Sequence, residues 1–402
     1  MGVVQVIKVC KVDFRASKET IGRLFECNRL SAQIWNDTLV LARDYHKENG
    51  KWINKSQLHL STKRKYPLHS QSIQAVYEKH LQARENTRQA KIKGVANINY
   101  PWRTKKNFNT KWKKDGFKIY PGGKIELSMG TWQGKRQKPL VLKVGKLPPH
   151  QIKEIELIWD RKLKLAITYD DALEAKKASG LYLVAIDPGE IHSIAAVCEN
   201  NQGLIITGRK LRSIKRLRNK KVQELQKKMS QCQKHSRQWQ KYRRAMNYVL
   251  SKSEAQLKDG LHKISRLFVD WCIENNAKEV VAGDVEGIQR NTARKKTNPP
   301  KKIRSRKQNQ KLSQWQFGKL YKYLEYKLAE ENIPIKKVNE AYTSQTCPVC
   351  GRKKKVSGRV YQCYCGYSEH RDIHGAKNIL TKEKHGEFRD LAVNKIKYLR
   401  IA

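Results

Sequence analysis

The sequence has no apolar run long enough to span a bilayer, and it has few acidic residues for its size. Its first residues, Met1 to Val6, carry no cleavable signal pattern, so we expect a cytoplasmic protein with no membrane partner. Only 36 Asp and Glu residues accompany 85 Lys and Arg residues, and the formal net charge is +49. Because this excess runs through the whole chain and is mixed with Trp and Tyr, it favours a nucleic-acid partner, and hence a nucleoid-associated protein.

The cysteines also lack the distribution of a disulfide framework. Their number, nine, is odd, and five are scattered along the chain: Cys10, Cys27, Cys198, Cys232 and Cys272. The other four lie between residues 347 and 365. This distribution predicts reduced thiols and one metal site rather than a set of disulfides.

The crowded cysteines have the spacing of a structural zinc ribbon. Cys347 and Cys350 form one pair, Cys363 and Cys365 form the second, and a glycine after each pair allows a tight turn. The second pair has one intervening residue where two are more common, so His370 stays open as an alternative fourth ligand. A closed site of four thiolates leaves no position for a catalytic water, so we expect this Zn²⁺ to support folding.

The first part of the chain changes from strand to helix and back to strand. A Val-rich strand at residues 3–14 is followed by helical spacing of apolar residues after Ser17 and again over residues 71–90. Residues 100–114 combine Trp and Phe with Lys and Arg, which suits either stacking on bases or filling a small core. Short β patterns separated by turns over residues 117–169 predict a small antiparallel barrel.

Beyond a linker at residues 170–180, strand and helix patterns alternate, as a layered α/β domain requires. The segment from residue 210 to residue 248 is helical and densely cationic, with a thin apolar stripe, so it favours an anionic partner over simple exposure to solvent. Residues 290–311 are rich in Lys, Arg, Asn and Pro, and we interpret them as a loop over a nucleic-acid channel.

Two acidic residues stand where they suit catalysis. An apolar strand at residues 181–186 leads into Asp187, and the Pro-Gly that follows stops strand pairing, so that the carboxylate faces a cleft. Asp372 lies at the start of a helix of small residues that could pack closely on a sheet. With a third acid from the middle strands, these carboxylates predict a site for two Mg²⁺ ions in phosphodiester hydrolysis.

Three stretches carry a specific pattern: AIDPG at residues 185–189, YTSQTCPVCG at residues 342–351 and RDIHGAKNI at residues 371–379. Together they resemble the TnpB (OrfB) family, the RNA-guided DNA nucleases encoded by insertion sequences and related to compact type V CRISPR effectors. The resemblance implies an α/β multidomain protein. Its RNase H-like (RuvC) nuclease domain would carry an inserted zinc ribbon and would follow a β-barrel (wedge) domain with an inserted helical recognition lobe.

The resemblance also implies the domain boundaries. We expect the wedge barrel at residues 1–15 and 116–178, the helical recognition lobe at residues 16–115, the RuvC-like nuclease at residues 179–342 and 371–402, and the zinc ribbon at residues 343–370.

By the same resemblance, Asp187 carries the first acidic motif and Asp372 the third. The second motif departs from the family pattern, because the strand that usually ends in Glu here ends in Gly-Asp. Glu340, beside the Tyr-Thr-Ser-Gln-Thr run, resembles the relocated glutamate of some lineages. We predict that Glu340 completes the Mg²⁺ site, with Asp284 or Glu286 as the rival.

The expected activity is RNA-guided, Mg²⁺-dependent cleavage of double-stranded target DNA next to a short flanking motif. The guide RNA would come from the transposon end, and we expect a monomer rather than a dimer. A nuclease-dead, RNA-guided DNA-binding repressor is the alternative. A DNA-strand-transfer transposase is a third hypothesis, which the large basic surface suited to RNA disfavours.

Overall fold

The computed structural model describes residues 7–95, 97–148, 151–170, 180–286, 305–356 and 358–401. The chain divides into two compact units, Met1–Leu173 and Glu174–Ala402. Among the helices described, none is both long and apolar enough to cross a membrane. The linker predicted at residues 170–180 falls almost entirely outside the described residues.

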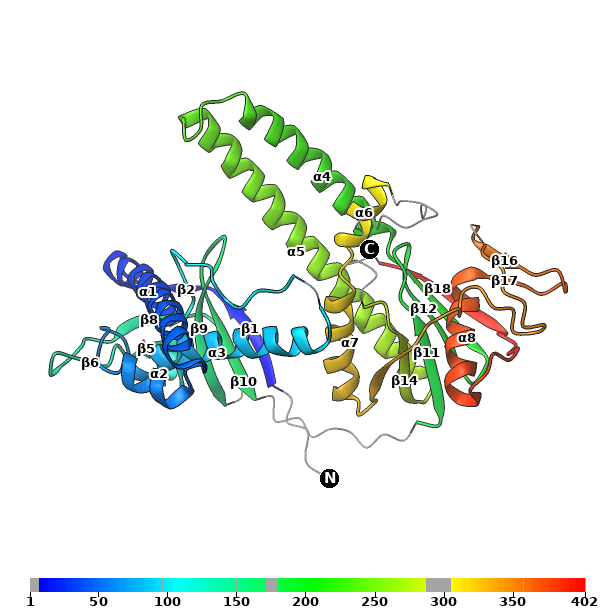
Figure 1. Cartoon of the computed structure of the whole chain (residues 1–402), viewed down its shortest axis with the longest axis horizontal. Helices are drawn as coiled ribbons and strands as arrows, with labels where there is room; N and C mark the ends of the chain where they lie inside the picture. The colour runs from blue at the N-terminus through cyan, green and yellow to red at the C-terminus, as the bar shows by residue number, and fades with distance from the viewer. Residues whose placement is uncertain are drawn as a thin grey trace. The chain divides into compact units, whose positions relative to one another are not determined.

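The helices of the first unit are α1 (Lys18–Asn49), α2 (Lys55–Thr62) and α3 (Ser70–Ile92), drawn in blue to cyan in Figure 1. As the sequence predicts, Ser17 caps α1, where its side chain accepts a hydrogen bond from the backbone N–H of Thr20. The helix ends at Gly50, whose φ of 63° lies in the left-handed region. Asn54 and Gln57 form a capping box at the start of α2.

The strands of the first unit pair into two antiparallel sheets. One has the order β1 (Ile7–Val12), β10 (Lys162–Asp170), β9 (Ile152–Asp160) and β3 (Thr110–Lys113). The other has the order β2 (Phe14–Arg15), β8 (Leu140–Val144), β5 (Lys124–Leu127) and β4 (Phe117–Tyr120). Short elements complete this region: η1 (Lys114–Gly116), η2 (Pro121–Gly123), β6 (Thr131–Trp132) and β7 (Lys135–Arg136). The helices are therefore an insertion between β2 and β3.

One hydrophobic core joins these helices to both sheets. Along β8, Leu140, Leu142 and Val144 are buried and the residues between them are exposed, which is the period of a strand with one face in the core. Trp112 of β3 is fully buried, and its indole N–H donates a hydrogen bond to the carbonyl oxygen of Ser128. The strands thus form two sheets around a shared core, and the closed barrel stays a prediction.

A six-stranded sheet forms the centre of the second unit. Its order is β15 (Ile335–Val338), β14 (Ala277–Gly283), β11 (Tyr182–Asp187), β12 (His192–Cys198), β13 (Gln202–Thr207) and β18 (Lys395–Arg400). β12 runs antiparallel to both β11 and β13, whereas β14, β15 and β18 each run parallel to the strand they join. The sequence analysis does not predict β18, because its side chains are mostly exposed and many are cationic.

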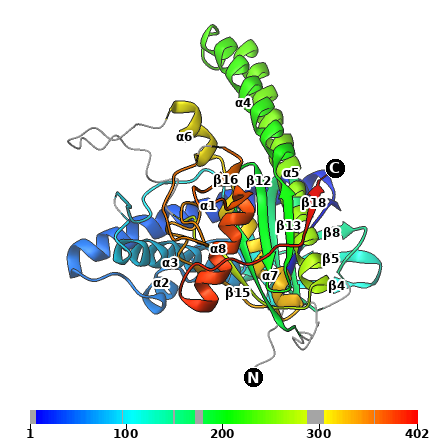
Figure 2. The same cartoon turned by 90° about the vertical axis from the view of Figure 1, so that its right-hand side faces the viewer.

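Helices cover both faces of this sheet, which lies between α7 and α8 in Figure 1. α5 (Arg237–Glu274) and α7 (Phe317–Glu330) pack on one face, where Phe268 is fully buried. α8 (Arg371–His385) packs on the other face through small and apolar side chains such as Ala376, and Figure 2 shows it in front of the strands. The mixed α/β class that the sequence predicts is confirmed.

The cationic segment forms two antiparallel helices rather than one. α4 (Arg209–Ser230) and the first part of α5 lie side by side (Figure 1). The chain reverses through His235, whose φ is 70°, and Ser236 caps α5. Of the basic loop predicted at residues 290–311, the first part lies outside the described residues, and the last part forms α6 (Arg306–Ser313).

His80 of α3 provides a test of the first core. Its ring packs edge-on against Trp35, with 5.7 Å between centroids, and burial lowers the pKa of His80 from 6.5 to about 4. Because the folded pKa lies below the unfolded value, the unfolded chain binds the proton first as the pH falls. We expect this residue to remove as much as ~3 kcal/mol of unfolding free energy as the pH falls from 6.5 to about 4.

Urea unfolding of the wild type and of His80→Gln at a series of pH values measures this effect. The variant should show a shallower loss of stability over the same pH interval. His235→Gln is the matched control, since that side chain is exposed, and it should keep the wild-type slope. Equal slopes for wild type and His80→Gln would contradict the prediction.

Candidate functional site

Asp187 is the last residue of β11, and its carboxyl group lies against α8. The chain leaves the sheet at once through Pro188 and Gly189, so the side chain stands at the strand end, as the sequence predicts. On α8, a Cβ added at Gly375 would lie 2.4 Å from Oδ2 of Asp187. Any side chain at that position would collide with the carboxyl group, so glycine is what permits the helix to approach.

Asp372 lies in the first turn of α8, one turn before Gly375. The partial positive charge at a helix N-terminus favours a carboxylate at this position. The charge of Asp372 in turn raises the pKa of Asp187. The same helix therefore supplies both the close contact with Asp187 and the second acid.

Glu340 follows β15, and its side chain reaches the end of the neighbouring strand β14. A Cβ added at Gly283, the last residue of β14, would lie 2.5 Å from Oε2 and 3.3 Å from Cβ of Glu340. Glu340 therefore occupies the space that a side chain at the end of β14 would fill. Burial raises the pKa of Glu340, and the negative charge of Asp284 raises it further.

The rival acids, Asp284 and Glu286, lie nearby but have a cationic partner. Nζ of Lys337 lies 3.6 Å from Oδ1 of Asp284 and 3.1 Å from Oε2 of Glu286. The backbone N–H of Glu286 also donates to Oδ1 of Asp284 at 2.9 Å. Both rivals are exposed, whereas Glu340 is half-buried and acts directly on the pKa of Asp187.

The electrostatics of the site suit a divalent cation. Burial is the largest effect that raises the pKa of Asp187 to about 8, and the charges of Glu340 and Asp372 add to it, while Arg371 acts in the opposite direction. Hard cations such as Mg²⁺ prefer oxygen ligands and would relieve the repulsion among these carboxylates. The donor set therefore fits the predicted Mg²⁺.

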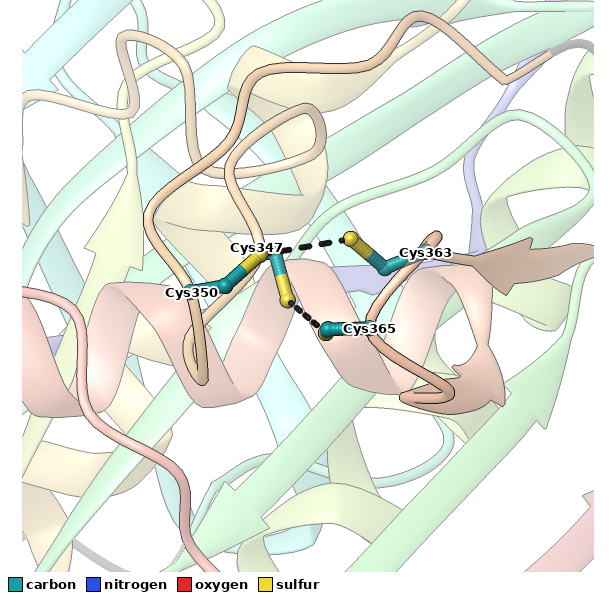
Figure 3. Close-up of side chains that lie close together, drawn as sticks. All are labelled: Cys347, Cys350, Cys363 and Cys365. Carbon is teal, nitrogen blue, oxygen red and sulfur yellow. Dashed lines mark hydrogen bonds between the residues drawn. The ribbon is translucent and has the colours of Figure 1, made fainter.

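The four cysteines predicted as zinc ligands lie together (Figure 3). Their sulfur atoms lie within 4.8 Å of one another, with 3.6 Å between those of Cys347 and Cys365 and 3.5 Å between those of Cys350 and Cys363. Four tetrahedral Zn–S bonds of about 2.3 Å place sulfur atoms about 3.8 Å apart. The cluster therefore fits a structural Zn²⁺.

The short second cysteine pair does not prevent this geometry. Gly351 and Gly366, which follow the two pairs, have φ of 70° and 89°, in the region that favours glycine. His370, the alternative fourth ligand, groups instead with His192 and Asp372. The arrangement favours Cys365 as the fourth ligand.

The ribbon is joined directly to the acidic site. β16 (Val360–Gln362) pairs with β17 (Ser368–His370), and β17 runs straight into α8. His374 of α8 stacks on Tyr361, with ring centroids 3.9 Å apart. Folding of the ribbon thus positions the first turn of α8, where Asp372 lies.

The sequence analysis gave no role to Asn378 or His192. Asn378 of α8 donates hydrogen bonds to the carbonyl oxygens of Thr343 at 2.7 Å and Thr346 at 2.8 Å, which hold the loop after Glu340. Its place in the small-residue helix motif was the only signal in the sequence. His192 lies in β12 near Asp372, and no local pattern marks it.

A cationic cavity of about 590 Å³ lies between α4 and α6. Its basic lining residues are Arg209, Arg212, Lys215, Arg216, Lys307 and Lys311. Burial lowers the pKa of Lys215 to about 8, and the positive charge of Arg218 contributes. Because like charges this close repel one another, the cavity favours an anionic ligand.

The segment of mixed aromatic and basic residues divides between core and surface. Trp112 is fully buried, and Phe108 stacks on Trp35 with 5.1 Å between centroids. Trp102, by contrast, is 58% exposed, and the guanidinium of Arg103 lies 5.2 Å from its ring. Core filling therefore describes the first two residues, whereas Trp102 is free to stack on a base.

Two family models match the chain: "Probable transposase" (OrfB_IS605) over residues 166–289, and "Cas12f1-like, TNB domain" over residues 317–379. The TnpB-like protein MJ0751 of Methanocaldococcus jannaschii is 27% identical over 215 residues, which is 52% of this chain and 72% of that protein. The CRISPR-associated endodeoxyribonuclease Cas12f1 of Sulfoacidibacillus thermotolerans is 28% identical over 122 residues, 29% of this chain and 25% of that protein.

A cryo-EM structure of a Cas12f1–sgRNA–target DNA complex is similar to this one, with a TM-score of 0.64 at 16% identity, covering 91% of this chain and 84% of that chain. At this identity the likeness shows a shared fold. The family models, the relatives and this fold agree with the sequence motifs around Asp187, Cys347 and Asp372. By sequence motif, partial family match and fold, the chain is similar to the TnpB (OrfB) family and to Cas12f1.

Proposed function

We propose that this protein is an RNA-guided, Mg²⁺-dependent DNA endonuclease of a transposable element, which cuts target DNA next to a short flanking motif. The observation that carries the proposal is electrostatic: burial, together with the charges of Glu340 and Asp372, raises the pKa of Asp187 to about 8. Carboxylates brought together in this way form the ligand set of a hard divalent cation. The endonuclease relatives support the same activity.

The three acids would hold the cation, which when bound supplies a Lewis acid and an activated water for phosphodiester hydrolysis. The chain's own contribution is the arrangement of these acids. Gly375 lets α8 approach Asp187, and Gly283 leaves space for Glu340 at the end of β14. The proposed zinc in the cysteine cluster would hold the start of α8 and therefore Asp372.

We assign the acidic site to a RuvC-like domain of residues 179–342 and 371–402, with the zinc ribbon at residues 343–370. The mixed six-stranded sheet, with helices packed on both faces, supports the assignment. Residues 1–15 and 116–178 would form the wedge barrel, and the recognition lobe at residues 16–115 would be inserted in it.

A guide RNA from the transposon end and double-stranded target DNA are the proposed partners of a monomeric protein. The net charge of +49, the cationic cavity between α4 and α6, and the exposed Trp102 support nucleic-acid binding. In RNA-guided effectors, pairing with the guide selects the target sequence while the protein contacts the duplex shape and a short flanking motif.

A nuclease-dead, RNA-guided repressor is the second candidate, and Gly283 favours it, because the family usually places Glu at that strand end. Against it stands the retained acid cluster, since unpaired carboxylates near phosphates bring no advantage to a protein that only binds. Plasmid cleavage by the purified protein with its copurified RNA and Mg²⁺ tests the proposal. RNA-dependent binding without cleavage would establish the repressor instead.

Glu340→Ala tests the identity of the third acid. We expect cleavage to fall about 100-fold or more, because an interaction of several kcal/mol with the cation is lost, while RNA binding is unchanged. Asp284→Asn is the matched control, since Asp284 is exposed and paired with Lys337, and it should cleave at close to the wild-type rate. Full activity of Glu340→Ala with loss in Asp284→Asn would assign Asp284 instead.

Moving the carboxylate from residue 340 to residue 283, at the end of β14, tests whether the site needs an acid in this space whichever element supplies it. In Gly283→Glu alone, the new Cβ would lie 2.5 Å from Oε2 of Glu340, so we expect loss of cleavage. Gly283→Glu combined with Glu340→Ala removes that collision and returns a carboxylate to the same space. The double variant should cleave measurably faster than either single variant in a time course with Mg²⁺.

Cys365→Ser tests the metal of the ribbon. We expect the purified wild type to contain about one zinc per chain and the variant to contain less, with a lower Tm and lost cleavage, because β17 no longer holds Asp372. Cys232→Ser, outside the cluster, is the control and should retain both metal and activity. Zinc content and Tm both retained in Cys365→Ser but both lowered in His370→Asn would make His370 the fourth ligand of the cysteine cluster.

A further inference from the structure

Two histidines lie beside Asp372, in a group separate from the four cysteines. His192 begins β12 and His370 ends β17, immediately before α8. One nitrogen of each imidazole and one carboxylate oxygen of Asp372 lie within 4.8 Å of one another. The three side chains therefore come from three different elements of the second unit and converge on one point.

The environment fixes the ring of His192. The residue is only 3% exposed, and the rings of His370 and Tyr398 pack edge-on against it at 5.5 Å and 5.7 Å between centroids. Its Nε2 atom lies 3.9 Å from Oδ2 of Asp372. Because the ring of His192 is already held in place, it would lose little conformational freedom when its nitrogen binds a metal.

Nε2 of His192 is already in the state that binds a metal. Nη1 of Arg359 lies 3.2 Å from it, and a guanidinium can only donate, so Nε2 is the unprotonated nitrogen. The guanidinium thus places a positive charge where a metal cation would be. Nδ1 of His192 then carries the ring proton, and within the part of the chain described it is buried without an acceptor. Nδ1 of His370 is buried without a partner as well, and such a buried polar atom in a native protein calls for a further ligand or a water.

The chemistry of these donors differs from that of the other acids. Imidazole nitrogens select first-row transition metals, whereas Mg²⁺ prefers oxygen. Nitrogen and oxygen ligands about 2.1 Å from a tetrahedral ion are about 3.4 Å apart. The three donor atoms lie within 4.8 Å of one another, so the widest pair would have to close by at most about 1.4 Å.

We infer that His192, His370 and Asp372 form a binding site for a divalent transition-metal ion, separate from the cysteine cluster. Asp187 and Glu340 then make up the oxygen-only part of the acidic site. The inference deepens the proposed function, because Asp372 belongs to both sets, and it assigns His192 and His370 as metal ligands. Arg359 is the cation that competes for the same nitrogen.

Mn²⁺ is the probe for this site, because pulsed EPR detects nitrogen nuclei bonded to it. We expect one equivalent of Mn²⁺, added to the full-length chain with its cysteine cluster loaded with zinc, to show nitrogen modulation that changes when histidine carries the heavier nitrogen isotope. His192→Gln and His370→Asn should each weaken Mn²⁺ binding about tenfold or more, and the double variant should lose the modulation. Unchanged modulation in the double variant would overturn the inference.

Two further variants separate ligation from damage to the fold. Arg359→Gln removes the competing cation, so Mn²⁺ should bind more tightly, and weaker binding would contradict the proposed site. His385→Gln changes an exposed histidine at the other end of α8 and should leave both affinity and modulation unchanged. Zinc content and Tm, measured on every variant, show that each chain is folded.

Mg²⁺-dependent plasmid cleavage by the same preparations with their copurified RNA distinguishes this inference from the proposed function. Nitrogen modulation without cleavage would support the histidine site and contradict the nuclease. Cleavage without nitrogen modulation would support the nuclease and overturn the histidine site.

Discussion

The close approach of α8 to the end of β11 is the constraint on which the acidic site depends. At Gly375 the helix passes so near Asp187 that a single added carbon would lie 2.4 Å from its carboxyl oxygen. Because packed interiors do not deform continuously, this contact fixes how closely α8 packs on the sheet. It therefore also fixes the position of Asp372, one turn earlier in α8. The same contact removes water from Asp187, which is the main reason that its pKa rises.

A second close contact joins Gly283 and Glu340. In the first contact the glycine lies on a helix and the acid on a strand, whereas here the glycine ends a strand and the acid lies on a loop. Here the strand end lacks a side chain, and an acid from the loop after β15 fills the space. A loop holds a carboxylate less firmly than a strand does, but Asn378 binds two carbonyl groups of that loop to α8. The helix that approaches Asp187 therefore also steadies the region of Glu340.

Local patterns were sufficient for the features that depend on a few neighbouring residues. The apolar run before Asp187, the cysteine spacing and the cap at Ser17 each predicted what the structure contains. Sequence alone left Glu340 and Asp284 as rivals, since their difference rests on Lys337 and Gly283, which meet them only in space. For the same reason it could not find His192, and it could not foresee that the cationic segment folds back on itself.

The overall charge of +49 and the acidic site act on a phosphate backbone with opposite sign. The basic cavity between α4 and α6 attracts a polyanion over about one Debye length, roughly 8 Å in physiological salt. At contact distance the negative charges of Glu340 and Asp372 repel phosphates instead, and the same charges help burial to keep Asp187 protonated, with a pKa of about 8. Attraction and repulsion thus come from different parts of one unit. In the proposed nuclease, a cation at the acids would reverse the local sign, so binding of nucleic acid and admission of the scissile phosphate would be separate events.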